Sequence, residues 1–179
     1  MDKIEELLKN QQTDLQKQAL TDTSYKNIDH SLSDDDTNFE LATYGDAILK
    51  LALCKIYRRD KKHGMQFPEN LSDWKKKYES DEVLVRVVAK HYNLLGFFRY
   101  DEKGNGKPKE QKPIDYKYEG KNAKRRYKYI ATAMEACIAA VYIESTENGE
   151  NGGKEVRKIV EKWIQWIDEA ANFPDKETV

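Results

Sequence analysis

Apolar residues along the chain recur at intervals of three and four, which is the spacing of one face of an α-helix. A first helical region covers residues 2–20, with an irregular middle near Gln12. The longest stretch, residues 38–59, is apolar on nearly every side, and a second strongly apolar stretch covers residues 127–144. An amphipathic stretch follows at residues 154–171. No segment keeps the alternation of a β-strand, so the pattern predicts an all-α fold in a single domain, with the 38–59 helix at its centre.

Polar segments between these helices set the predicted boundaries of the domain. The predicted domain spans residues 1–170, and residues 171–179 form a C-terminal tail. Residues 101–122 combine glycines and prolines with many lysines, which is typical of a basic, mobile surface loop. Just before the central helix, the sequence offers three candidate residues to cap its first amide groups: Asp36, Thr37 and Asn38.

Composition narrows the classes of protein to consider. A chain of 179 residues is long enough to bury one core without disulfides. Cys54 and Cys137 lie in apolar helical segments without metal-ligand spacing, so we expect reduced core thiols. The charged N-terminal sequence is unlike a signal peptide, and no apolar run reaches membrane-spanning length, which predicts a cytoplasmic protein without membrane contact. The net charge of −1 does not indicate a nucleic-acid binder by itself.

Each of the two most apolar helices carries an isolated carboxylate, and these are the candidate chemical groups. Asp46 follows Gly45 in the first helix, and Glu135 lies in the second. A glycine inside a helix usually permits close approach of another backbone. If the helices pack together, Asp46 and Glu135 would face each other and could bind Mg²⁺, or Mn²⁺ in its place. The alternative is that each acid is paired with a lysine or arginine and that the two acids lie far apart.

The densest basic run of the chain leads into the helix that carries Glu135. From Lys103 to Lys128 there are ten Lys or Arg residues against three acids. Such a run beside an acidic site is expected for a metal-dependent enzyme that acts on a phosphate backbone. The first part of the run, residues 103–112, is more simply a solvated loop, whereas residues 121–128 adjoin the candidate site.

These stretches resemble the ribonuclease III family. The 38–59 helix resembles the family signature through Asn38, Leu41, Gly45 and Asp46, and residues 18–27 resemble the segment that precedes this signature. The 130–144 segment resembles the second acidic helix, with Glu135 at the position of the metal-binding glutamate. The resemblance covers roughly residues 1–170. It implies an all-α nuclease domain, usually homodimeric, that cleaves double-stranded RNA with Mg²⁺.

The sequence departs from the family pattern at two expected carboxylates. Ala42 occupies the position of a glutamate one turn before Asp46, and Thr132 that of an aspartate three residues before Glu135. Phe39 also replaces the first glutamate of the signature. The Mini-ribonuclease III branch similarly has alanine and threonine at the first two positions, and residues 121–126 resemble a loop of that branch.

Two hypotheses follow. In the first, the chain is a Mg²⁺-dependent endoribonuclease that cleaves double-stranded or structured RNA and leaves 5′-phosphate and 3′-hydroxyl ends. Asp46 and Glu135 would be the catalytic and metal-binding residues, Thr132 would orient a water molecule, and Thr43 and Tyr44 would lie in a homodimer interface. The predicted RNA-binding residues are Lys121, Asn122, Lys124, Arg125 and Arg126. In the second, the chain is a catalytically inactive ribonuclease III-fold module that binds RNA or a ribonucleoprotein.

Overall fold

The structure is a computed structural model that describes residues 1–62, 70–101, 116 and 123–172, and these residues form helices without a strand. The only β-type pairing among them is an isolated bridge between Thr21 and Arg99. The all-α prediction is confirmed for this part of the chain. In order, the elements are α1 (Lys3–Asn10), α2 (Asp14–Ala19), η1 (Thr23–Asn27), η2 (Asp34–Asp36), α3 (Phe39–Lys62), α4 (Leu71–Glu79), α5 (Asp81–Val83), the π-helical η3 (Leu84–Ala89), η4 (Leu94–Gly96), α6 (Ala123–Glu147) and α7 (Gly152–Asn172).

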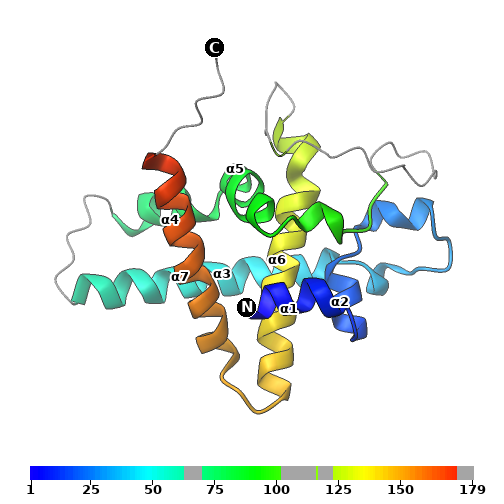
Figure 1. Cartoon of the computed structure of the whole chain (residues 1–179), viewed down its shortest axis with the longest axis horizontal. Helices are drawn as coiled ribbons and strands as arrows, with labels where there is room; N and C mark the ends of the chain where they lie inside the picture. Colours follow the sequence, from blue (N-terminus) through cyan, green and yellow to red (C-terminus); the bar gives the residue numbers. More distant parts are fainter. Residues whose placement is uncertain (63–69, 102–115, 117–122, 173–179) are drawn as a thin grey trace.

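The two longest helices cross steeply, and their contact is the most extensive between any two elements (Figure 1). Helix α6 is the more deeply buried of the two, since every residue from Ala136 to Val141 is at most 2% exposed. Helix α3 is buried on one side only, and it exposes Tyr44 and Leu51 to solvent at 47% and 54%. The prediction that the 38–59 helix is the central one is therefore corrected: α6 takes the centre, because its small residues let neighbours pack around it.

Gly45 lies where α3 crosses α6. A Cβ atom on Gly45 would lie 1.8 Å from the carbonyl oxygen of Glu135 and 2.5 Å from its carbonyl carbon. Both are backbone atoms, so no side chain could move aside to make room. The prediction that this glycine permits close approach of another backbone is confirmed, and the partner is the residue that carries the second candidate carboxylate.

Helix boundaries follow local capping chemistry at some positions and depart from prediction at others. The break near Gln12 is confirmed, since Gln11 ends α1 in the left-handed conformation and Thr13 caps α2. The predicted caps of α3 are wrong. The Asp36 carboxylate accepts from Ser33 instead, the Thr37 hydroxyl donates to the carbonyl of Asp34, and neither amide atom of Asn38 has a hydrogen-bond partner.

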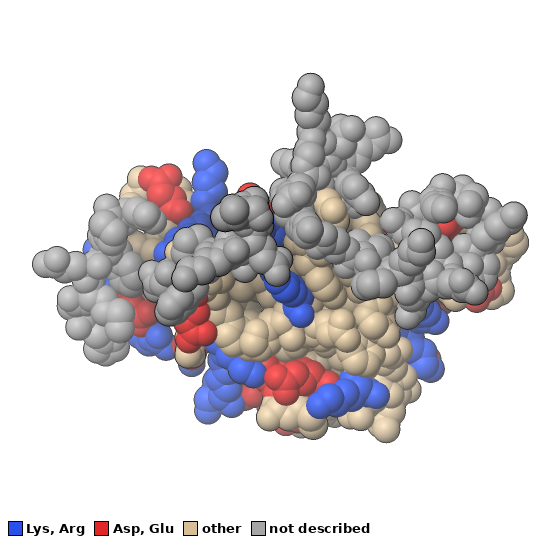
Figure 2. Space-filling model, turned by 45° about the horizontal axis from the view of Figure 1, so that its top comes forward, with Lys and Arg blue, Asp and Glu red and all other residues tan. Residues whose placement is uncertain are grey.

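Much of the predicted basic loop (101–122) and of the tail (171–179) lies outside the described residues, and so do Lys121 and Asn122. Lys124, Arg125 and Arg126 belong to the first turns of α6 by their backbone. On the face drawn in Figure 2, acidic and basic side chains alternate among the described residues, without an extended area of one charge. Cys54 and Cys137 are free thiols, and no helix of the described part has the length and apolarity to cross a membrane.

Candidate active site

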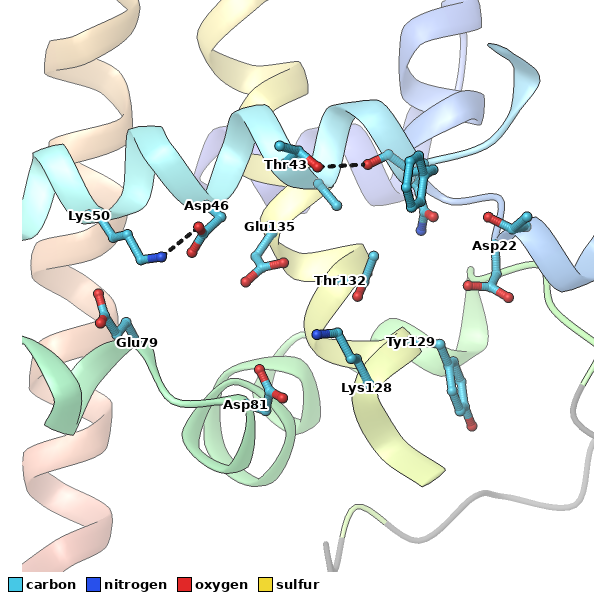
Figure 3. Close-up of a pocket in the computed structure, with 14 residues that line it drawn as sticks. Asp22, Thr43, Asp46, Lys50, Glu79, Asp81, Lys128, Tyr129, Thr132 and Glu135 are labelled. Carbon is cyan, nitrogen blue, oxygen red and sulfur yellow. Dashed lines mark hydrogen bonds and ion pairs between the residues drawn. The ribbon is translucent and has the colours of Figure 1, made fainter. Parts of the chain in front are cut away.

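A cleft of about 640 Å³ opens beside the crossing of α3 and α6. Its walls come from the first half of α3, the first half of α6, the junction of α4 and α5, and the start of η1 (Figure 3). Five carboxyl groups line the cleft, against two lysines. The lining residues are Asp22, Thr23, Asn38, Phe39, Ala42, Thr43, Asp46, Lys50, Glu79, Asp81, Lys128, Tyr129, Thr132 and Glu135.

Asp46 and Glu135, the two acids predicted from sequence, both line this cleft, and their side chains lie side by side where α3 crosses α6 (Figure 3). Burial, together with the charges of Asp46 and Asp81, raises the pKa of the Glu135 carboxyl from its ordinary 4.5 to about 7. Asp46 thus disfavours ionisation of Glu135, as expected when like charges share a partly dry site.

The alternative prediction, that each acid pairs with a lysine or arginine far from the other acid, is confirmed for Asp46 only in part. Its carboxylate accepts a hydrogen bond of 2.6 Å from the ammonium of Lys50, one turn later on α3. That alternative also placed Asp46 and Glu135 far apart, and here they line the same cleft. Asp46 therefore has a lysine partner and an acidic neighbour at once.

The two positions at which the resemblance to ribonuclease III predicts further carboxylates also line the cleft. Ala42 lies one turn before Asp46 on α3, and Thr132 lies three residues before Glu135 on α6. The cleft therefore has the wall positions of a four-carboxylate site. Two of those positions carry a methyl group and a hydroxyl group in this chain.

Divalent-cation binding is chemically reasonable at this site. Among the described residues no cluster of three or more His, Cys, Asp or Glu side chains has ligand geometry. Two facing carboxylates still suit Mg²⁺, because this ion takes oxygen ligands and commonly keeps several waters when one or two carboxylates hold it. The pKa of Glu135 is raised mainly by burial and in part by the negative charges of Asp46 and Asp81, and a bound cation would offset the latter. Asp46 and Glu135 are the residues that fit this role.

Sequence reasoning missed several residues of the cleft. The ion pair between Lys50 and Asp46 could have been predicted, because side chains four residues apart on a helix are neighbours. Glu79 and Asp81 reach the cleft only through the packing of α4 and α5, for which the sequence gives no local signal. Asn38 is 1% exposed with an unpartnered side-chain amide, and its spacing suggested a cap instead.

The other predicted residues lie around this site. Thr43 and Tyr44, predicted at a dimer interface, are both exposed on α3, and the ring of Tyr44 meets that of Tyr142 edge-on at 6.0 Å. Thr43 also lines the cleft. Lys128, the last cation of the predicted basic run, lies at the edge of the cleft, where it is exposed.

Comparison with known families identifies the domain to which this cleft belongs. The sequence pattern of the ribonuclease III domain matches residues 40–146, which is more than half of the chain. The chain belongs to the ribonuclease III family. The matched region of this ribonuclease III domain begins in the first turn of α3 and ends in the last turn of α6, so it contains both candidate acids. A search of curated proteins found no match to the sequence. Membership of the family implies an endoribonuclease-like function directed at double-stranded RNA.

Proposed function

We propose that this protein is a Mg²⁺-dependent endoribonuclease that cleaves double-stranded or structured RNA and leaves 5′-phosphate and 3′-hydroxyl ends. The observation that carries the proposal is the meeting of Asp46 and Glu135 in one cleft of a ribonuclease III domain. The excess of carboxyl groups there would repel an RNA phosphate, so the cleft needs a cation before it can accept one. A carboxylate-bound divalent cation meets that requirement.

The residues of the cleft have distinct proposed roles. Asp46 and Glu135 would hold the ion, which when bound supplies the positive charge that lowers the pKa of a water and stabilises charge developing on the phosphate. The Thr132 hydroxyl, half-buried on α6, can orient a water by hydrogen bonding. Water oxygen forms the new bond to phosphorus, the bond to the 3′ oxygen breaks, and that oxygen takes up a proton. The exposed ammonium of Lys128 and the basic residues 121–126 would contact phosphates of the RNA.

Removing the Asp46 charge tests this function. We expect wild-type protein to cut an end-labelled RNA duplex with Mg²⁺ or Mn²⁺, and Asp46→Asn to cut at least about tenfold more slowly, because loss of a metal contact or its support commonly costs that much. Asp14→Asn is the matched control, since Asp14 is fully exposed on α2 and away from the cleft. Absence of cleavage by wild-type protein with every divalent ion tried would end the proposal, and equal cleavage by Asp46→Asn would indicate a contaminating nuclease.

A second candidate function is a catalytically inactive module that binds RNA or a ribonucleoprotein. Two observations favour it: Ala42 and Thr132 supply no carboxylates, and Asp46 already has Lys50 as a partner. It predicts that RNA binds without being cut and that Asp46→Asn binds RNA as well as wild-type protein does. The resemblance to Mini-ribonuclease III, which has alanine and threonine at the same places, favours the enzyme instead.

A homodimer built on α3 is part of the proposal. Besides its buried side and its cleft side, α3 has a third face on which Tyr44, Ala47 and Leu51 are exposed at near-heptad spacing. Exposed apolar residues in a row on one helix commonly mark an interface. Family resemblance implies the same, because ribonuclease III domains are usually homodimeric and place two sites along one duplex.

A charge on this face should prevent dimerisation. We expect the wild-type protein to have twice the 20.9 kDa mass of the chain, and Tyr44→Glu to shift it to a monomer because a carboxylate cannot be desolvated there cheaply. Light scattering after size exclusion gives both masses. Lys90→Glu, an exposed site just after η3 and away from α3, is the control for added negative charge. A wild-type protein that stays monomeric at high concentration would contradict the interface.

A further inference from the structure

Lys50 is the cationic residue of the cleft that directly contacts a candidate metal-binding carboxylate. It lies one helical turn after Asp46, and its ammonium donates to Oδ2 of Asp46 at 2.6 Å. The two side chains are 43% and 36% exposed, so water and ions can reach the pair. An aspartate followed by a lysine four residues later is a locally favoured pair on a helix.

Three carboxyl groups of the cleft act electrostatically on this ammonium. Figure 3 shows the end of the Lys50 side chain between Asp46, on its own helix, and Glu79, at the end of α4. Hydrogen bonding to Asp46 raises the pKa of Lys50, and the charges of Glu79 and Glu135 act in the same direction. Lys50 therefore carries the charge that neutralises part of the acidic cleft when no other cation is present.

A divalent cation and an ammonium group cannot both occupy the same face of one carboxylate, because their charges repel. We propose that Lys50 competes with the divalent cation for Asp46. When the ion binds, the ammonium moves from Asp46 toward Glu79, so Lys50 lowers the affinity of the site for the cation. This rests on the proposed function, since it assumes that Asp46 is a metal-binding residue.

Glu79 is suited to receive the displaced ammonium. Its carboxylate is 16% exposed, lies on the far side of the cleft from α3, and is already held in place by two hydrogen bonds from Lys75 at 2.9 and 3.0 Å. A fixed carboxylate at that place gives Lys50 a second partner within the same cleft. Glu79 thereby lowers the free-energy cost of moving the Lys50 ammonium away from Asp46, although some cost remains.

Binding of Mn²⁺ to the full chain without RNA tests the proposal, with free Mn²⁺ measured by electron paramagnetic resonance. Lys50→Met should bind Mn²⁺ about tenfold more tightly than wild-type protein, equivalent to about 1.4 kcal/mol. Lys55→Met is the matched control, because Lys55 is exposed on the same helix and does not line the cleft. It should bind as wild-type protein does. Asp46→Asn should weaken binding in both the wild-type and the Lys50→Met backgrounds.

A second pair of variants isolates the role of Glu79. Glu79→Gln should weaken Mn²⁺ binding when Lys50 is present and leave it nearly unchanged in the Lys50→Met background, because only the displaced ammonium needs Glu79. An equal effect in both backgrounds would show that Glu79 acts on the ion directly, and the displacement step would then be wrong.

The outcomes separate this inference from the proposed function. If wild-type protein binds Mn²⁺ through Asp46 but Lys50→Met binds equally or more weakly, the competition is refuted while the metal site stands. If neither protein binds Mn²⁺ saturably, both the competition and the metal-dependent function are refuted. Thermal unfolding without metal confirms that each variant is folded before its binding is compared.

Discussion

Glu135→Gln is expected to stabilise the folded protein above pH 7 while it ends RNA cleavage. The folded-state pKa of Glu135 is raised from 4.5 to about 7, so the folded state holds a proton that the unfolded state has released between these values. The contribution of this protonated carboxyl to stability is complete below pH 4.5 and is lost as the pH rises through 7. Above pH 7 the folded protein carries an unfavourable ionised carboxylate, and a neutral glutamine removes that cost.

The expected gain in stability of Glu135→Gln follows from the shift in the pKa of Glu135. A change from 4.5 to about 7 corresponds to about 3 kcal/mol if the site were fully dry. Solvent reaches the cleft and screens the charges, so we expect a gain of about 1–2 kcal/mol at pH 8 and almost none at pH 4. For a domain of this size that is a rise of about 2–8 °C in Tm. Thermal unfolding of both proteins at the two pH values measures it.

Cation binding supplies the control for this prediction. Mg²⁺ should raise the Tm of wild-type protein at pH 8 and have less effect on Glu135→Gln, since the variant lacks one of the two carboxylates proposed to hold the ion. In the duplex assay the variant should lose more than about 100-fold in rate, as expected when electrostatic support of the transition state is removed. A variant that is less stable than wild-type protein at pH 8 would show that Glu135 is a structural residue.

Gly45→Ala is expected to destabilise the protein by about 3 kcal/mol or more. Alanine is the better helix former by about 1 kcal/mol, so propensity alone predicts the opposite sign. The added Cβ would lie 1.8 Å from the carbonyl oxygen of Glu135, however, and it can be accommodated only if α3 and α6 move apart. Overpacking of a core commonly costs about 1–3 kcal/mol, and a backbone clash lies at the upper end or beyond. Urea unfolding measures the loss.

Gly153→Ala provides the comparison, because its Cβ would meet no atom closer than 3.6 Å near the start of α7. That variant should be as stable as wild-type protein or slightly more stable. If Gly45→Ala is equally stable, the close crossing of α3 and α6 described above is wrong. If it folds but loses Mg²⁺-dependent stabilisation, the separation of the two helices has carried Asp46 away from Glu135.

Much of the fold was predictable from periodicity, because α3, α6 and α7 carry apolar residues at helical spacing over many turns. The relative burial of α3 and α6 was not, since it depends on which helix has neighbours on every side. The caps of α3 were also mispredicted. Asp36 and Thr37 are short polar residues with several acceptors or donors within reach, and the polar turn before the helix offered them nearer partners than the helix amides.

The candidate site was predictable to the extent that its chemistry lies on two helices. Asp46, Glu135 and Gly45 are conspicuous because a charge or a glycine is unusual in an apolar helix, and the structure brings all three to one crossing. Asp81 and Glu79 were not identified, because they lie in a polar segment where acids are ordinary. Only tertiary packing turns them toward the cleft.

The contact between Gly45 and the backbone of Glu135 also bears on how the site can adapt. The two acids are attached to main chains that already touch, so the width of the cleft at that point cannot shrink, and it can grow only if entire helices are displaced. Rotation of the two carboxyl side chains is then the only inexpensive adjustment near the crossing. Because the distance between the two backbones is fixed, this site should discriminate between cations by their radius more sharply than a site carried on a loop.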